Sequence, residues 1–70
     1  MLAVFRSKTE TLNFASIMRS YRVPCVVVNT PRTINVACGI SVKFEDTFQN
    51  TANTIISRRG FSTFAGFYNL

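Results

Sequence analysis

The chain has 70 residues, of which 47% are hydrophobic and 16% charged, and its net charge is +5. This composition is typical of a small globular domain and excludes a disordered chain. The sequence has no histidine and three carboxylates, so histidine-dependent nucleophilic catalysis and histidine-bearing metal sites are excluded. No apolar run reaches the ~20 residues of a membrane span. We therefore predict one domain over residues 1–70, with no metal, no cofactor and no membrane association.

The first third of the chain predicts a strand and then a helix. The apolar run Leu2–Arg6 predicts the strand. Ser7 and Glu10 fit a capping box, in which Ser7 accepts from the third backbone N–H and Glu10 reaches back to the cap. The helix is expected to continue to about Tyr21, because Val23-Pro24 stops it. A period of 100° per residue places one set of side chains toward the core, namely Phe14, Ala15, Ile17, Met18 and Tyr21.

The middle of the chain predicts two strands joined by a loop. The uninterrupted β-branched run Cys25–Asn29 predicts the first strand. Thr30-Pro31-Arg32 then begins a loop that runs to Cys38-Gly39. Residues 40–45 alternate with period two and predict the next strand. Its core-facing side chains are expected to be Ile40, Val42 and Phe44, and its water-facing ones Ser41, Lys43 and Glu45.

The last third predicts a second helix and a final strand. Asp46 is expected to cap this helix, with Gln49 three residues later, and Gly60 is expected just beyond its end. The apolar stripe of the helix comprises Phe48, Ala52, Ile55 and Ile56, and Arg58 and Arg59 lie in its last turn, where cations suit the helix dipole. Residues 61–68 predict the final strand, with a bulge or a close approach at Gly66.

The order β-α-β-β-α-β predicts an α+β ferredoxin-like sandwich. We expect a four-stranded antiparallel sheet in the order 4-1-3-2, with both helices on one face. This topology puts Cys38 and the start of the first helix at one end of the sheet, with the cations Arg6, Lys8, Arg32, Arg58 and Arg59. Cations and a helix N-terminus favour the thiolate form of a cysteine. Cys25 is expected at the opposite end as a buried, inert thiol, too distant for a disulfide with Cys38.

One combination of motifs resembles a known family. Thr30-Pro31-Arg32, followed after a short spacer by Cys38-Gly39-Ile40, resembles the selenium/sulfur carrier-like family. The resemblance covers nearly the whole chain, since it includes Phe5-Arg6-Ser7, Val23-Pro24 and an aromatic C-terminal strand. The chain departs from the family pattern at Arg22, where glycine is common, and at Asn35 and Ala37, where serines are frequent.

The resemblance implies a persulfide or perselenide carrier with a single reactive thiol rather than a self-sufficient enzyme. Cys38 would hold the sulfur or selenium, and donor and acceptor proteins would be its partners. Arg32, assisted by Lys8, would stabilise the anion, and Gly39 would let a partner backbone approach. Thr30 and Asn35 are candidates for polar contacts. Two cysteines are too few for the disulfide framework of a small secreted domain, so we expect a reducing cytoplasm.

Two alternatives remain open from the residues. The first is a small basic βαββαβ module that binds a nucleic acid or a protein partner without catalysis, since a charge of +5 suits anions. Nucleic acid is the weaker version, because residues 39–44 lack the aromatic signature of RNA-recognition folds. The second is a homodimer through the open face of the sheet, which Phe5, Val27 and Phe67 would make apolar. Dimerisation is also compatible with a carrier.

Overall fold

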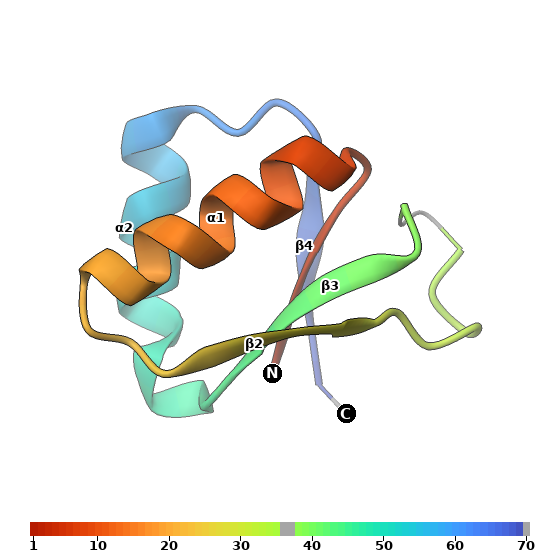
Figure 1. Ribbon diagram of the computed structural model, residues 1–70, viewed down its shortest axis with the longest axis horizontal. Helices are drawn as coiled ribbons and strands as arrows, with labels where there is room; N and C mark the ends of the chain where they lie inside the picture. The colour runs from red at the N-terminus through yellow and green to blue at the C-terminus, as the bar shows by residue number, and fades with distance from the viewer. Residues whose placement is uncertain (36–37, 70) are drawn as a thin grey trace.

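The structure is a computed structural model that describes residues 1–35 and 38–69. Its elements follow the predicted order (Figure 1): β1 Leu2–Phe5, α1 Lys8–Ser20, β2 Cys25–Asn29, β3 Ile40–Phe44, α2 Gln49–Arg59 and β4 Phe64–Tyr68. The strands form one antiparallel sheet in the order β2-β3-β1-β4, which confirms the predicted ferredoxin-like α+β sandwich. Within the described residues, no helix combines the length and the apolar character needed to cross a membrane.

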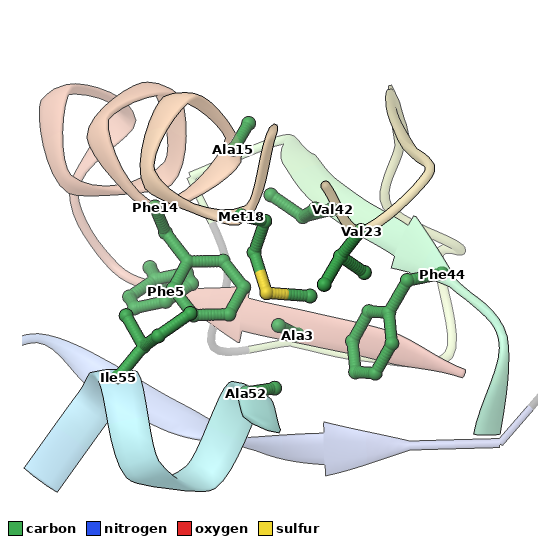
Figure 2. Packing of buried hydrophobic residues seen from close by; sticks show 10 residues of the cluster. All are labelled: Ala3, Phe5, Phe14, Ala15, Met18, Val23, Val42, Phe44, Ala52 and Ile55. Carbon is green, nitrogen blue, oxygen red and sulfur yellow. The ribbon is translucent and has the colours of Figure 1, made fainter. Parts of the chain in front are cut away.

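The core lies between one face of the sheet and both helices. Alternate residues of a strand face opposite sides, and in β1 and β3 one side is apolar throughout. Figure 2 shows α1 and α2 closing over this side, with the ring of Phe5 between them. The Phe5 ring lies 5.1 Å from Phe14 and 5.3 Å from both Phe61 and Phe64, measured between centroids. The buried cluster comprises Ala3, Phe5, Phe14, Ala15, Met18, Val23, Val42, Phe44, Ala52 and Ile55.

The start of α1 confirms half of the predicted capping box. The Ser7 hydroxyl accepts from the Glu10 N–H at 3.3 Å, as expected. Glu10 does not reach back to Ser7, so that part of the prediction is wrong. Its carboxylate instead accepts from the Thr63 N–H at 2.9 Å and from the hydroxyls of Thr63 and Ser62. Glu10 therefore ties the first turn of α1 to the turn that precedes β4.

The end of α1 is a Schellman motif. The Arg22 N–H donates to the Arg19 carbonyl at 2.9 Å, and the Val23 N–H donates to the Met18 carbonyl at 3.0 Å. Arg22 has a φ of 61°, in the left-handed region. Tyr21 was predicted to face the core but is 47% exposed. The prediction failed because Tyr21 is the C-cap residue, where the helical period no longer sets the side-chain direction.

The start of α2 also differs from the prediction. Asp46 does not cap the helix, because a 3₁₀ turn over Asp46–Phe48 comes first and Phe48 occupies the cap position. The Asp46 carboxylate lies 3.2 Å from the amino group of Met1 instead. The end of α2 confirms the prediction for Gly60, which has a φ of 66° and donates its N–H to the Ile56 carbonyl at 3.0 Å.

A bulge interrupts β4 at the predicted place. Phe64 pairs with Phe5 and Gly66 pairs with Val4, so Ala65 is the extra residue. Because of this extra residue, Phe64 and Phe67 both face the helices, with their centroids 5.0 Å apart. Residues 61–63, predicted to belong to this strand, form the turn before it.

The open face of the sheet corrects two expectations. Ser41 was expected to face water, yet it is fully buried on this face and its hydroxyl bonds that of Thr30. Phe5, Val27 and Phe67 were expected here, but all three pack on the helix side. The alternation of the strands and the bulge at Gly66 decide this placement. The apolar surface predicted for a dimer therefore does not carry these side chains.

Candidate functional site around Cys38

Cys38 and Gly39 extend the ladder of β3 between the ends of its two neighbours. The Cys38 N–H donates to the Phe5 carbonyl at the end of β1 at 3.3 Å. The Thr30 N–H, just beyond β2, donates to the Gly39 carbonyl at 2.9 Å. Gly39 has a φ of 104°, and a Cβ atom there would meet nothing within 4 Å. The backbone conformation, rather than a lack of space, therefore explains the glycine next to Cys38.

Cys38 is an exposed residue, and its sulfur lies against the first turn of α1. Its Sγ atom is 3.7 Å from the Thr11 Oγ1 and 3.7 Å from the Ile40 carbonyl oxygen. Thr11 is fully buried, and its hydroxyl also donates to the Ser7 carbonyl at 2.9 Å. A thiol at this position thus has a hydroxyl on the helix side and water on the other.

The sequence prediction missed Thr11. The signal was present, because Thr11 lies at i in the spacing i, i+3, i+4, i+7 that continues through Phe14, Ala15 and Met18. That spacing places Thr11 on the core side of the helix, in its first turn. A polar residue at the start of an apolar stripe, beside the end of a sheet, is the pattern that would have identified it.

Among the described residues, the other predicted site residues make no hydrogen bond to the Cys38 sulfur. Lys8 is exposed as the first residue of α1, and Arg32 and Asn35 are exposed in the loop between β2 and β3. The Ile34 N–H donates to the Pro31 carbonyl at 3.0 Å and closes a turn around Arg32. Thr30 lies at the base of this loop, bonded to Ser41 on the open face. Ala37, next to Cys38, lies outside the described residues.

Cys25 occupies a different environment at the opposite end of β3. Cys25 pairs with Phe44, the last residue of β3, whereas Cys38 precedes the first. Its side chain is half-buried, and its thiol donates to the Ala15 carbonyl at 3.6 Å. Burial raises the pKa of the Cys25 thiol, and the nearby charge of Arg19 offsets part of that increase. Both thiols are free, and Cys38 is the more accessible of the two because it is exposed whereas Cys25 is half-buried.

Comparison with known protein families identifies one match. The family model described as "Putative Se/S carrier protein-like" matches residues 1–68. The chain belongs to this Se/S carrier protein-like family. The family description indicates a carrier of selenium or sulfur, which implies partners that deliver and accept the element. No curated protein and no solved structure matches the chain.

In this Se/S carrier-like chain, two of the predicted cations lie away from the cysteine. Arg58 and Arg59 end α2 on the left of Figure 1, while the start of β3 lies on the right. Arg59 lines a surface hollow of about 390 Å³ with Glu10, Asn13 and residues of the same side of α1. The prediction that Arg58 and Arg59 gather beside Cys38 is therefore wrong, because the start of α1 and the end of α2 share one end of the sheet but not one side of it.

Proposed function

We propose that this chain carries sulfur or selenium as a persulfide or perselenide on Cys38. The observation that carries the proposal is the exposed residue Cys38, a free cysteine whose Sγ atom lies at the first turn of α1, beside the Thr11 hydroxyl. The half-buried Cys25, with its raised pKa, is the poorer nucleophile. A reducing cytoplasm, which keeps both thiols free, is the compartment we propose for this activity.

The transfer step needs no oxidant or reductant. The Cys38 thiolate attacks the outer sulfur of a donor persulfide, R–S–SH, and a new sulfur–sulfur bond forms on Cys38. The sulfur–sulfur bond of the donor breaks, and R–S⁻ leaves and takes a proton from solvent. A donor perselenide reacts in the same way at selenium. An acceptor nucleophile then attacks the outer atom on Cys38 and releases the Cys38 thiolate.

The neighbouring residues have simple roles in this proposal. The Thr11 hydroxyl can accept from the Cys38 thiol, or turn from the Ser7 carbonyl and donate to the thiolate. Arg32 and Lys8 are long exposed cations on the flanking loop and helix start, suited to attract an anionic donor group. Thr30 supports the base of the loop through Ser41, and Asn35 offers an exposed amide to a partner. A carrier needs no general base of its own, because its donor and acceptor partners supply the remaining chemistry.

A nucleic-acid-binding module is less well supported. RNA-recognition folds of this topology stack bases on aromatic side chains of the sheet's central strands. On the face away from the helices, the central strands β1 and β3 carry Leu2, Val4, Ser41 and Lys43. None of these is aromatic, and all but Lys43 are fully buried.

Incubation with a persulfide-charged sulfurtransferase tests the proposal. The reduced full chain should gain one sulfur atom by mass spectrometry, on the peptide that contains Cys38. Cys38→Ser should abolish the gain, and Cys25→Ser, the matched control, should retain it. Sulfur on Cys25, or no sulfur on the wild-type chain, would overturn the proposal.

A further inference from the structure

The two edges of the sheet differ in how they are protected. The strand order leaves β2 and β4 at the edges. A bulge at Ala65 and Gly66 disrupts β4, and such irregularities prevent an edge from pairing with another chain. In β2 the residues Cys25–Asn29 include no charge and no proline, and they pair with β3 in unbroken register. Val26 is 53% exposed on this strand. β2 is therefore a regular and unprotected edge.

The direction of the backbone groups on this edge follows from one hydrogen bond. The Thr30 N–H donates to Gly39, on the strand side that faces β3. Backbone groups alternate in direction along an antiparallel ladder, so the N–H and C=O groups of Val26 and Val28 also point toward β3. Cys25, Val27 and Asn29 must then direct their N–H and C=O groups away from the sheet. Within the described part of the chain, no hydrogen bond to these outward groups is found, and β2 is an outermost strand in Figure 1.

We propose that β2 pairs antiparallel with β2 of a second copy of this chain, centred on Val27. The outward groups are arranged symmetrically about Val27, so a two-fold axis through this residue aligns them. Val27 faces Val27 of the second copy, and each Cys25 faces Asn29 of the other. Each of these three pairs is of the hydrogen-bonded type, which exchanges two N–H to C=O bonds. The result is one continuous sheet across two copies.

The side chains of β2 and the charges at its ends allow a second copy in this orientation. Each copy carries a net charge of +5, but none of that charge lies on β2, so the strands themselves do not repel. At the Cys25 end, the cations Arg19 and Arg22 balance the carboxylates Glu45 and Asp46, and Arg32 lies beyond the Asn29 end. Antiparallel pairing directs Arg32 toward this balanced end of the second copy, whereas parallel pairing would bring the two Arg32 side chains together. On the open face, the exposed Val26 meets Val28 of the second copy.

The interface leaves the candidate thiol free. Cys38 hydrogen-bonds to β1 through its N–H and contacts α1 through its sulfur, so it lies on the side of β3 away from β2. Both Cys38 thiols of the pair stay accessible. The pairing of β2 and the chemistry of Cys38 can therefore succeed or fail independently.

Two substitutions in β2 and one control test this proposal by sedimentation velocity over a concentration series. Val26→Lys puts a charge opposite Val28 of the second copy. Asn29→Pro removes an outward N–H without removing a bond to β3, a position where an edge strand tolerates proline. Thr54→Lys adds the same charge as Val26→Lys on the exposed side of α2. The wild type and Thr54→Lys should approach twice the 7.9 kDa chain mass at high concentration, and both β2 variants should remain near one chain mass.

Amide hydrogen exchange provides the second measurement. The Val27 amide should exchange slowly in the concentrated wild type and quickly in Val26→Lys, while the amides of β1 stay protected in both. A wild-type chain that remains monomeric at millimolar concentration would overturn the proposal. So would a dimer that both β2 variants retain, since that dimer would use another face. Alkylation of Cys38 at the wild-type rate in Val26→Lys would show that the variant is folded.

Discussion

One cysteine lies beside each end of α1, and the two cysteines have different surroundings. At the N-terminal end, the Cys38 sulfur is exposed and contacts the buried hydroxyl of Thr11. At the C-terminal end, Cys25 is half-buried and its thiol donates to the carbonyl of Ala15. Both thiols lie near a backbone carbonyl that can accept from them, Ile40 for Cys38 and Ala15 for Cys25. The two environments therefore differ in exposure and in the hydroxyl of Thr11, which only Cys38 has beside it.

The same helix ends also differ in backbone conformation. The first turn follows an ordinary side-chain cap, with Ser7 bonded to the Glu10 N–H. The last turn is closed by main-chain bonds and requires Arg22 in the left-handed region. Chemistry is thus proposed at the end where the backbone is relaxed, and backbone strain is found at the other.

The largest expected effect is a difference in alkylation rate between the two thiols. Cys38 should react with iodoacetamide at least about tenfold faster than Cys25 near neutral pH, because it is exposed and because burial raises the pKa of Cys25. Peptide mapping against time measures both rates in the native chain. Cys38→Ser should remove the fast reaction and Cys25→Ser the slow one. Equal rates for the two thiols would remove the basis of the comparison.

Substitution of Arg22 tests the strain at the other end. Arg22→Gly should raise the free energy of unfolding by roughly 1 kcal/mol, since a side chain in the left-handed region costs about 1–2 kcal/mol and the flexibility of glycine offsets part of the gain. Arg19→Gly is the matched control, because Arg19 lies within the helix and should instead lose about 0.5–1 kcal/mol. Urea denaturation measures both. The same sign for the two variants would contradict the assignment of strain to Arg22.

The local part of this architecture could be predicted from the sequence. The periodicity of residues 40–45, the cap at Ser7 and the glycine at position 60 each depend on neighbours a few positions away, and each predicted its element correctly. The predicted family was also confirmed, by the match over residues 1–68. Arg22, with its φ of 61°, occupies a conformation that glycine adopts without strain.

The long-range contacts could not be predicted in this way. Glu10 bonds Thr63 across 53 positions of the chain, and a local capping pattern offered a competing explanation for the same carboxylate. Thr11 meets Cys38 across 27 positions, only because the starts of α1 and β3 lie at the same end of the sheet. The same topology suggested that Arg58 and Arg59 would join them, since element order indicates the end of the sheet but not the position across its width.

Removal of the Thr11 hydroxyl tests its contact with the Cys38 sulfur. Thr11→Val preserves the shape of the buried side chain, and it should slow alkylation of Cys38 by roughly two- to tenfold, from a hydrogen bond of about 0.5–1.5 kcal/mol. Thr11→Ser keeps the hydroxyl and should react at nearly the wild-type rate. The rate for Cys25 serves as an internal control, because its sulfur contacts Ala15 instead. If the valine and serine variants react alike, the hydroxyl has no role at the thiol.

The smallest expected effect concerns Glu10, which ties the N-terminal turn of α1 to the turn before β4. Hydrogen bonds from the Thr63 hydroxyl and N–H, with a further bond from Ser62, hold the pKa of Glu10 below its ordinary value of 4.5. A carboxyl with a lowered folded-state pKa stabilises the fold fully above its unfolded-state value, and this stabilisation is lost as the pH falls through the folded-state value. Glu10→Gln should therefore be less stable than the wild type above pH 4.5, by a small amount because the group lies at the surface. The difference in the free energy of unfolding should shrink in more acidic solution, and urea denaturation across that pH range measures it.

Glu45→Gln is the control, because it removes the same charge from an exposed side chain. Its difference from the wild type should not shrink in this way. A gap between Glu10→Gln and wild type that stays constant into strong acid would show that the contribution of the bonds to Thr63 does not depend on the charge of Glu10.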